Sequence, residues 1–478
     1  MTNDGGVTLL HEVAERRLPV ARLEPVIGHE RYERLMTVAA RVRKRLADRT
    51  IWNVSSVAVG GGVAEMLQVI VGYVAGADIP IRWTIIGGDP QFFGITKRLP
   101  NQIHGADGQA EPVGSADARY YEQGLAANAD ELLTHVRPGD IAILHDPQTA
   151  GLTGALARAG VRVLWRCHIG IDTRTTSPVP PGTSCVPTCR PRTATCLPGG
   201  SSRRCGCRAP GPDHPAVDRP VLGQERRARP GERRGDPDHH RDLRRSRTSG
   251  PGCFLRDDGS RGTVRRAGLV MGDGRPGPDD PVVVQVSRWD RLKDMAGVMS
   301  GFAGYVLPAG DAYLLLVGPS MSGVADDPEG AVVFAECLAQ WNQLPPNVRE
   351  RVLLVTLPLD DVEENAAMVN AIQRRATVIV QKSLAEGFGL TVAEGMWKGR
   401  PVVGSAVGGI VDQIVEGTGI LLPDPADLAT FGSEVGWLLD HRQEAERMGA
   451  AGMAYTREHF VGDVHLLRFA ELVEATAG

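Results

Sequence analysis

The sequence predicts an α/β protein with two doubly wound parallel-sheet domains that face each other across a cleft. Short apolar strands alternate with amphipathic helices up to about residue 172, and the same alternation resumes at about residue 281. At 478 residues, the chain is also too long for a single hydrophobic core. Strands that alternate with helices form parallel sheets covered on both faces, and such sheets bind ligands beyond their carboxyl ends.

The N-terminal elements begin with a helix over His29–Asp48. Its apolar residues recur at the spacing of one helix face: Leu35, Val38, Ala39, Val42 and Leu46. A strand over Ile51–Ser56 and a glycine turn at Gly60–Gly62 lead into a second helix, with a similar face at Val63, Met66, Leu67, Ile70, Val71 and Val74. Further strands are predicted at Arg82–Ile86, Ile141–His145 and Val161–Trp165.

The C-terminal elements repeat this pattern. Strands are predicted at Val282–Val286, Tyr313–Val317, Val352–Thr356, Thr377–Gln381 and Pro401–Gly404. Helices are predicted at Met295–Tyr305, Val362–Arg374, Leu390–Lys398 and Asp427–Leu439, with a last helix near Val464–Ala475. Two sheets of this kind place a ligand cleft between their carboxyl edges.

Composition and charge exclude several classes of partner. The net charge of −4 and the 23% of charged residues give no reason to expect binding to nucleic acid or to an anionic membrane. No apolar run reaches the roughly 18 residues that span a bilayer. The N-terminus also lacks the basic start and apolar stretch of a secretion signal. A cytoplasmic location is therefore expected.

Residues 173–250 do not follow the pattern of either domain. They contain 16 Arg and 12 Pro among 78 residues, no Ile, Met, Phe, Tyr, Trp or Lys, and seven Val or Leu. Such a segment cannot bury enough apolar surface to offset the entropy lost on ordering. A structureless loop of this length is also unusual inside a compact enzyme.

Three interpretations of this segment stay open. Translation of GC-rich DNA out of frame yields Arg, Pro, Gly, Ser, Thr and stray Cys, and we favour this interpretation, with the segment disordered. A natural disordered insertion is the second. The third is a metal or disulfide module, because five cysteines cluster in the segment: Cys185, Cys189, Cys196, Cys205 and Cys207. No paired C-x-x-C or nearby His at finger spacing supports that module.

Two glutamates in the stretch EGFGLTVAE form the strongest candidate site. Glu386 follows the strand TVIVQKS, so it lies in a loop at the carboxyl edge of the sheet. Gly387 and Gly389 allow close backbone approach to a ligand, and the following helix points its first amides at the cleft, which suits a diphosphate. Glu394, about one turn into that helix, can accept hydrogen bonds from vicinal hydroxyls. The alternative is a pair of solvated glutamates beside a tight turn.

Two cations follow the first strand of the C-terminal domain, in the stretch VSRWDRLKD. Arg288 and Lys293 are placed to neutralise a diphosphate leaving group, where charge develops in the transition state. Either residue alone is better explained as an ordinary surface charge. Their position in the same sheet as the glutamate loop favours the functional interpretation.

The N-terminal half contributes a second set of candidates. Gly60, Gly61 and Gly62 let backbone amides reach a phosphate or a sugar, and the loop matches neither a dinucleotide nor an ATP fingerprint. Glu65 can bind a sugar hydroxyl or can simply stabilise the helix N-terminus. His168 and Asp146 each follow a strand at its carboxyl edge, where functional and structural roles are about equally expected.

The two motifs EGFGLTVAE and SRWDRLK resemble those of glycosyltransferase family 4, a family of retaining enzymes with the GT-B fold. The stretches VSSVAVGGGVAEML, IIGGDPQFFGITKRL, LHDPQ and LWRCHI are similar to the trehalose glycosyltransferring synthase group. The similarity covers about Leu23–Asp172 and Phe254–Ala475. It implies an N-terminal sugar or acceptor domain over 1–172, an aberrant segment over 173–253, a nucleotide-sugar domain over 254–460 and a C-terminal helix over 461–478.

The resemblance implies transfer of glucose from UDP-glucose or ADP-glucose to glucose, which forms trehalose reversibly and requires no metal. Nucleotide diphosphoglucose and glucose or trehalose are the implied partners, and the oligomeric state stays open, with a homodimer as one option. Catalytic roles fall on Glu386, His168, Arg288 and Lys293. Nucleotide-sugar binding falls on Glu394 and on a loop of four residues: Gly387, Phe388, Gly389 and Leu390. The sugar or phosphate loop comprises Gly60, Gly61, Gly62, Glu65 and Asp146.

Two departures from the family pattern leave alternatives. Pro100 stands where the family has a histidine after TKRL, and residues 173–250 carry none of the family pattern. A trehalose phosphorylase of the same superfamily is the second candidate enzyme, and an inactive, frame-damaged chain is the third hypothesis. An interaction arm formed by a natural insertion is the fourth.

Overall fold

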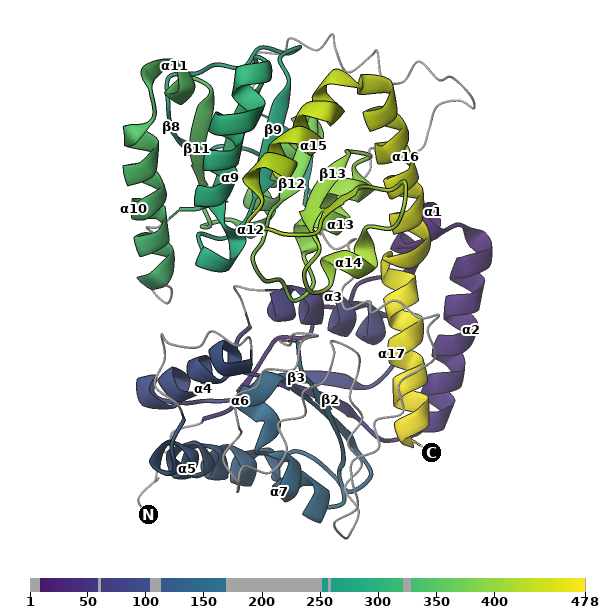
Figure 1. The fold of residues 1–478 in the computed structure, drawn as a ribbon. Coiled ribbons are helices and arrows are strands. Elements are labelled where there is room, and N and C mark those ends of the chain that lie inside the picture. The colour runs from purple at the N-terminus through teal and green to yellow at the C-terminus, as the bar shows by residue number, and fades with distance from the viewer. Residues whose placement is uncertain are drawn as a thin grey trace.

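The structure is a computed structural model, and it describes residues 9–58, 62–103, 113–168, 252–256, 259–320 and 328–477. These residues form two α/β domains, one above the other in Figure 1. Within the described residues, no helix is long and apolar enough to cross a membrane. Gly60, Gly61 and residues 173–251, with the five clustered cysteines, lie outside the described residues.

The N-terminal domain has one five-stranded sheet. Its strands are β1 (His11–Glu12), β2 (Ile51–Ser55), β3 (Ile81–Ile85), β4 (Ile141–His145) and β5 (Arg162–Arg166), in the order β1-β3-β2-β4-β5. All neighbouring pairs are parallel except β1 with β3. The sequence predicts the four parallel strands to within one residue at each end. It does not predict β1, because two exposed residues carry no apolar alternation.

Helices cover both faces of this sheet. One face is covered by α1 (Glu24–Ile27), α2 (His29–Leu46) and α3 (Gly62–Gly76), and the other by α4 (Pro90–Ile103), α5 (Ser115–Leu132), α6 (Asp146–Ala150) and α7 (Thr153–Arg158). The predicted apolar face of α2 is confirmed: Leu35, Ala39, Val42 and Leu46 are buried and Val38 packs against the same core.

The C-terminal domain has a seven-stranded sheet of order β14-β13-β12-β9-β10-β11-β8. Its strands are β8 (Leu269–Met271), β9 (Val282–Val286), β10 (Tyr313–Pro319), β11 (Val352–Leu357), β12 (Val378–Gln381), β13 (Val402–Ser405) and β14 (Ile420–Leu422). The five predicted strands are confirmed as the parallel centre. The added edge strand β8 is antiparallel to β11, and a separate hairpin pairs β6 (Cys253–Leu255) with β7 (Arg261–Thr263).

Successive residues of β9 point into different cores: Val283 into one and Val282 and Val284 into the other. The first core is covered by α9 (Met295–Gly301), α10 (Pro328–Gln343), α15 (Leu428–Asp440) and α16 (Arg442–His459), and the second by α12 (Val362–Arg375), α13 (Leu390–Trp397) and α14 (Ile410–Gln413). The short helix α11 (Pro346–Arg349) precedes β11.

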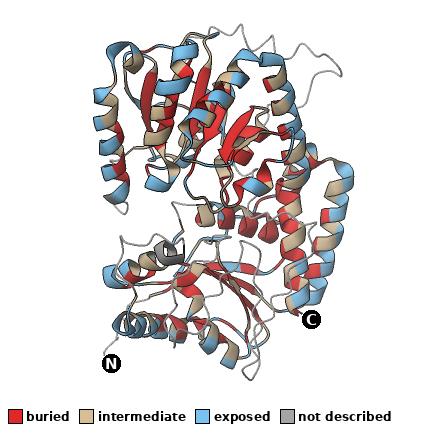
Figure 2. Cartoon of the chain, viewed as in Figure 1, coloured by how far each residue is buried: buried red, intermediate tan, exposed pale blue. Residues whose placement is uncertain are grey.

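In Figure 2 the strands at the centre of each domain are red, which marks them as buried. The predicted helix Met295–Tyr305 continues beyond α9 as a π-helical turn over Phe302–Val306.

The last helix, α17 (Gly462–Ala477), crosses back to the N-terminal domain and lies beside α2 (Figure 1). Leu466, Phe469 and Val473 belong to the N-terminal hydrophobic core. Asp463, almost fully buried, accepts two hydrogen bonds from Arg31 of α2, at 2.6 and 2.8 Å. The N-terminal core therefore includes residues of α17, far beyond position 172. The sequence predicted a C-terminal helix over 461–478 but not its packing against the N-terminal domain.

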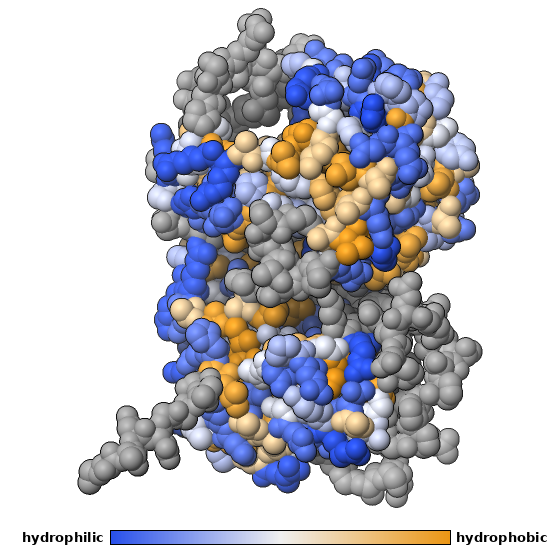
Figure 3. All heavy atoms as spheres, turned by 90° about the vertical axis from the view of Figure 1, so that its left-hand side faces the viewer, coloured by the Kyte–Doolittle hydropathy of each residue, from blue (hydrophilic) through white to orange (hydrophobic). Residues whose placement is uncertain are grey.

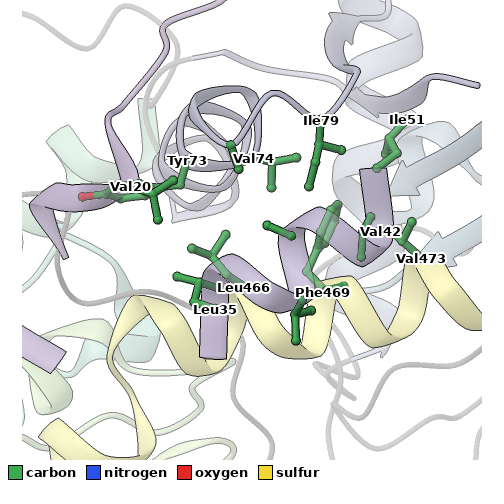
Figure 4. Close-up of a pocket in the computed structure, with 14 residues that line it drawn as sticks. Val20, Leu35, Val42, Ile51, Tyr73, Val74, Ile79, Leu466, Phe469 and Val473 are labelled. Atoms are coloured by element: carbon green, nitrogen blue, oxygen red, sulfur yellow. The ribbon is translucent and has the colours of Figure 1, made fainter. Parts of the chain in front are cut away.

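A small cavity of about 30 Å³ remains where α17 meets α2 and α3 (Figure 4). Its walls are apolar and include Leu35, Tyr73, Leu466 and Phe469. A site without polar partners does not retain water. The walls offer no charged group to a ligand.

The space-filling view of Figure 3 shows the two domains as separate lobes. Several large apolar side chains are exposed on the C-terminal domain, among them Leu269 on β8, Val332 on α10 and Val362 on α12. These residues come from different elements of the domain.

Candidate active site

The predicted cation and glutamate meet at the carboxyl edge of the C-terminal sheet. Lys293 follows β9 and Glu386 follows β12, and these two strands are parallel neighbours. Lys293 Nζ lies 2.6 Å from Glu386 Oε2, and the two side chains are 16% and 10% exposed. Ser383 Oγ donates a second hydrogen bond to the same carboxylate oxygen, at 3.2 Å. Glu386 is therefore held as a partly buried, ion-paired carboxylate.

The glutamate loop requires its glycines because other backbone approaches closely. Gly389 has φ of 82°, a left-handed conformation that favours glycine, and it is the N-cap of α13. A Cβ on Gly408, in the loop after β13, would collide with the carbonyl of Glu386. Phe388 is buried against Phe460, and Leu390 packs beside them. The side chains of Phe388 and Leu390 thus hold the loop in place by packing.

Glu394 lies in the second turn of α13, on the side that meets α12. Its Oε2 accepts a hydrogen bond from Nε2 of Gln373 at 2.9 Å. Gln373 is fully buried, whereas Glu394 is partly exposed. One oxygen of the Glu394 carboxylate is therefore fixed by a hydrogen bond from a buried amide.

The second predicted cation, Arg288, occupies a different environment. Its side chain is 60% exposed, and its guanidinium donates to Asp290 at 3.2 Å. Asp290 also caps the short turn that carries Lys293, by accepting from the amide of Leu292. The structure thus brings Lys293 to Glu386 and pairs Arg288 with Asp290 at the same edge.

A buried lysine that the sequence analysis did not select lies directly behind Lys293. Lys382 is fully buried, and its ammonium donates to the carboxylate of Asp294 and, at 2.6 Å, to the carbonyl of Pro425. Asp294 has φ of 49° and caps α9 by accepting from Gly297. These contacts fix the backbone at Asp294, the residue after Lys293, and so constrain the direction of the Lys293 side chain.

On the N-terminal side, the structure brings His168 and Asp146 together, two residues that the sequence placed only at the carboxyl ends of separate strands. The amide of His168 donates to Asp146 Oδ1 at 2.7 Å, and Asp146 has φ of 63°. The ring of His168 lies against the ring of His145, with Nε2 of His168 2.9 Å from Nδ1 of His145. The second nitrogen of His145 lies 3.1 Å from Oδ1 of Asn53.

The glycine loop enters α3, with Gly62 as the first helical residue and Glu65 in the first turn. Glu65 is exposed, as a residue that meets a ligand or stabilises a helix N-terminus would be. The two halves of the site approach each other at Gly387, because a Cβ there would lie 3.2 Å from the carbonyl oxygen of His168.

Both halves of the chain are similar to known proteins. Residues 53–181 match the family described as trehalose synthase, N-terminal domain, and residues 281–441 match the glycosyl transferases of group 1. A trehalose synthase of Rubrobacter xylanophilus is 31% identical over 458 residues, which cover 95% of this chain and 96% of the relative. One from Pyrococcus horikoshii is 28% identical and covers 98% of this chain and all of the relative. The chain belongs to this trehalose synthase family.

Solved structures support the same fold. An α,α-trehalose-phosphate synthase (UDP-forming) from Burkholderia xenovorans, in complex with glucose-6-phosphate, matches with a TM-score of 0.54 at 14% identity. The match covers 90% of this chain and all of the other. A sucrose-phosphate synthase from Thermosynechococcus elongatus matches with a TM-score of 0.51 at 17% identity. This member of the trehalose synthase family therefore has the GT-B fold. The family matches and the similarity to trehalose synthases make it a hexosyltransferase.

Within the described residues of this family member, no group of three His, Cys, Asp or Glu side chains is arranged to hold a metal ion. Positive charge at the carboxyl edge of the C-terminal sheet comes from Lys293 and Arg288 and from the N-terminus of α13.

Four polar residues beside the site were not predicted from the sequence: Asn53, His145, Gln373 and Lys382. Asn53 and His145 lie in strands, Gln373 lies near the end of α12 and Lys382 directly follows β12. An isolated polar residue at such a position gives no periodic signal. Their burial is the distinguishing property, and burial depends on neighbours from other parts of the chain. A polar residue within an apolar strand pattern was the one available hint.

Proposed function

We propose that this chain transfers the glucosyl unit of UDP-glucose or ADP-glucose to glucose, forming trehalose reversibly with retention at the anomeric carbon. The observation that carries the proposal is the Lys293–Glu386 ion pair at the carboxyl edge of the second sheet, with the carbonyl of His168 facing the same loop. A cation, a carboxylate and a helix N-terminus together match a negatively charged leaving group joined to a hydroxyl-rich sugar.

The donor side divides into three contacts. The diphosphate binds at the N-terminus of α13, where Lys293 and Arg288 add positive charge. Lys293 then exchanges Glu386 for a phosphate oxygen, and Glu386 becomes available to accept hydrogen bonds from the donor sugar. Glu394, with one oxygen held by Gln373, accepts from the ribose hydroxyls.

The acceptor side is formed by the N-terminal domain. The loop Gly60–Gly62, with Glu65 and Asp146, lines the sugar site in this proposal. His168 contacts the donor sugar near the bond that breaks, because its carbonyl lies beside Gly387 of the glutamate loop.

The chemistry follows from these positions. The bond between the anomeric carbon and the diphosphate oxygen breaks, and its electron pair stays on the phosphate. The acceptor hydroxyl attacks from the same face and passes its proton to that phosphate oxygen, so the configuration is retained. No metal is required in this scheme, since fixed cations and helix amides stabilise the developing charge.

The relatives support the choice of trehalose as product. Proteins named trehalose synthase match over nearly the whole length of this chain. The matches to proteins named trehalose phosphorylase include one of 27% identity over 33% of this chain and one of 23% over 88%. The match to the synthases is therefore the stronger support.

A single set of incubations tests the proposal. Purified full-length chain is given glucose with UDP-glucose, ADP-glucose or glucose 1-phosphate, with and without a metal chelator, and trehalose is quantified. We expect trehalose from a nucleotide donor, unaffected by the chelator. Turnover with glucose 1-phosphate alone would identify a phosphorylase, and absence of turnover with every donor would favour the inactive, frame-damaged chain.

The origin of residues 173–250 has its own test. We propose that the coding DNA across residues 167–254, translated in all three frames, contains an alternative sequence with strand and helix patterns. If no frame contains such patterns, the frameshift hypothesis is wrong and a natural insertion becomes the better explanation.

A further inference from the structure

Two polar side chains, Asn53 and His145, lie behind His168 in the core of the N-terminal domain. Asn53 lies in the middle of β2 and is fully buried, and His145 is the last residue of β4 and is 2% exposed. The neighbouring strand residues Val54 and Leu144 are fully buried and apolar. Polar side chains at such depth are retained when their hydrogen bonds serve a specific arrangement.

The hydrogen bonds define the proton positions on these side chains. Asn53 Nδ2 faces the carbonyl of Arg82 at 3.5 Å, so its Oδ1 faces His145. The opposite amide orientation would place two oxygens against each other. An amide oxygen only accepts, and therefore Nε2 of His145 carries a proton and donates it to Asn53.

The proton on Nε2 of His145 then determines the state of His168. In its neutral form an imidazole carries one proton, so one ring nitrogen donates and the other accepts. Nδ1 of His145 is thus an acceptor, and the nitrogen 2.9 Å away, Nε2 of His168, must donate. Together with the bond from the His168 amide to Asp146, this fixes both the ring and the backbone of His168.

We propose that Asn53 and His145 are positioning residues for His168, which hold its imidazole in the Nε2–H form and its carbonyl against Gly387. The expected effect on catalysis rests on the proposed function, whereas the proton positions do not depend on it. Asn53 and His145 belong to β2 and β4 of the N-terminal sheet. They act through His168, whose carbonyl lies 3.2 Å from the position of a Cβ on Gly387.

Nitrogen NMR of the histidine rings tests the proton positions without any need for turnover. Full-length chain labelled with 15N-histidine is compared with His145→Gln and His168→Gln to assign the two rings. We expect both rings in the Nε2–H form, with a change at His168 in Asn53→Leu. A proton on Nδ1 of His145, or an unchanged His168 signal in Asn53→Leu, would overturn the proposal.

Kinetics then separate positioning from simple support of the fold. Asn53→Leu is expected to lower kcat about 10- to 100-fold, the range for a displaced catalytic group, with KM for the donor changed less than about threefold. Added to His168→Ala, the same substitution is expected to cause no further loss. A further loss in the double variant would indicate a structural role and contradict the proposal.

The exposed His135, in the same domain, provides the matched control. His135→Gln is expected to leave the His145 and His168 signals and kcat unchanged. If the wild-type chain transfers no glucose from any donor, the proposed function fails, and the NMR result still decides the positioning of His168. If Asn53→Leu does not fold, the wild-type ring signals alone decide the proton positions.

Discussion

The two sides of the cleft use opposite physical means to hold their functional groups. On the C-terminal side, Lys293 and Glu386 form an ion pair that remains partly exposed. On the N-terminal side, His168 is held through neutral hydrogen bonds to His145 and through it to the buried Asn53. The C-terminal edge is thus built from an ion pair of partly exposed charges, and the N-terminal edge from a hydrogen-bonded network with buried members.

This difference corresponds to the two halves of the proposed substrate. A diphosphate is charged, so a site that binds it benefits from cations and a helix N-terminus. Sugar hydroxyls are neutral, and selecting among them depends on donors and acceptors at defined positions. Three substitutions test this contrast and a fourth tests a contact outside the site, and the expected effects decrease in that order.

Removal of the ion-pairing cation has the largest expected effect. Lys293→Ala should lower kcat/KM for the donor by about 10²- to 10³-fold, because a preorganised charge at the leaving group is lost. Steady-state kinetics measure this. Arg291→Ala is the matched control, since Arg291 pairs with Glu336 at 2.7 Å on the surface. Equal losses in the two variants would contradict a specific role for Lys293.

Removal of the fixed group on the other side comes next. His168→Ala should reduce kcat by about 10²-fold, with nucleoside diphosphate binding nearly unchanged, because His168 belongs to the sugar side. Kinetics together with calorimetry of UDP binding separate the two quantities. Loss of nucleotide binding in this variant would show that the two sides are not functionally distinct.

Loss of the ribose contact is expected to have a smaller effect. Glu394→Ala should weaken nucleoside diphosphate binding about 10-fold, which corresponds to about 1.4 kcal/mol. The wild-type chain should also discriminate against the 2′-deoxynucleotide, and the variant should not. Calorimetry with both nucleotides measures this, and undiminished discrimination in Glu394→Ala would exclude the ribose role.

The smallest expected effect concerns a charged contact away from the cleft. Arg256 of the β6–β7 hairpin donates to Asp361, at the start of α12, and lowers the pKa of that carboxyl to about 2. Because the folded pKa lies below the unfolded one of about 4, this contact stabilises the fold above about pH 4, and its stabilisation is lost as the pH falls towards 2. Asp361→Asn should remove this part of the acid dependence of Tm. An identical acid profile in wild type and variant would contradict it.

Local pattern was sufficient to predict that four candidate residues lie at strand ends. Glu386, Lys293, Asp146 and His168 each follow an apolar strand, and parallel strands deliver such residues to one edge. Local pattern was insufficient for Gln373, which reaches Glu394 from another helix. It was also insufficient for β1 and β8, which are short edge strands that depend on pairing with their neighbours.

The sequence by itself determined the two sheets, the helices of strong periodicity and the strand ends that carry the candidate residues. These follow from hydrophobic spacing and turn residues within about 20 positions of each other. The tertiary structure was needed to show that α17 completes the N-terminal core and that His145 and Asn53 form hydrogen bonds leading to His168. It was also needed to show that Lys382 binds Asp294, the residue after Lys293. The reason is physical: burial and hydrogen-bond partners are properties of pairs of residues distant in sequence, and no local pattern encodes such pairs.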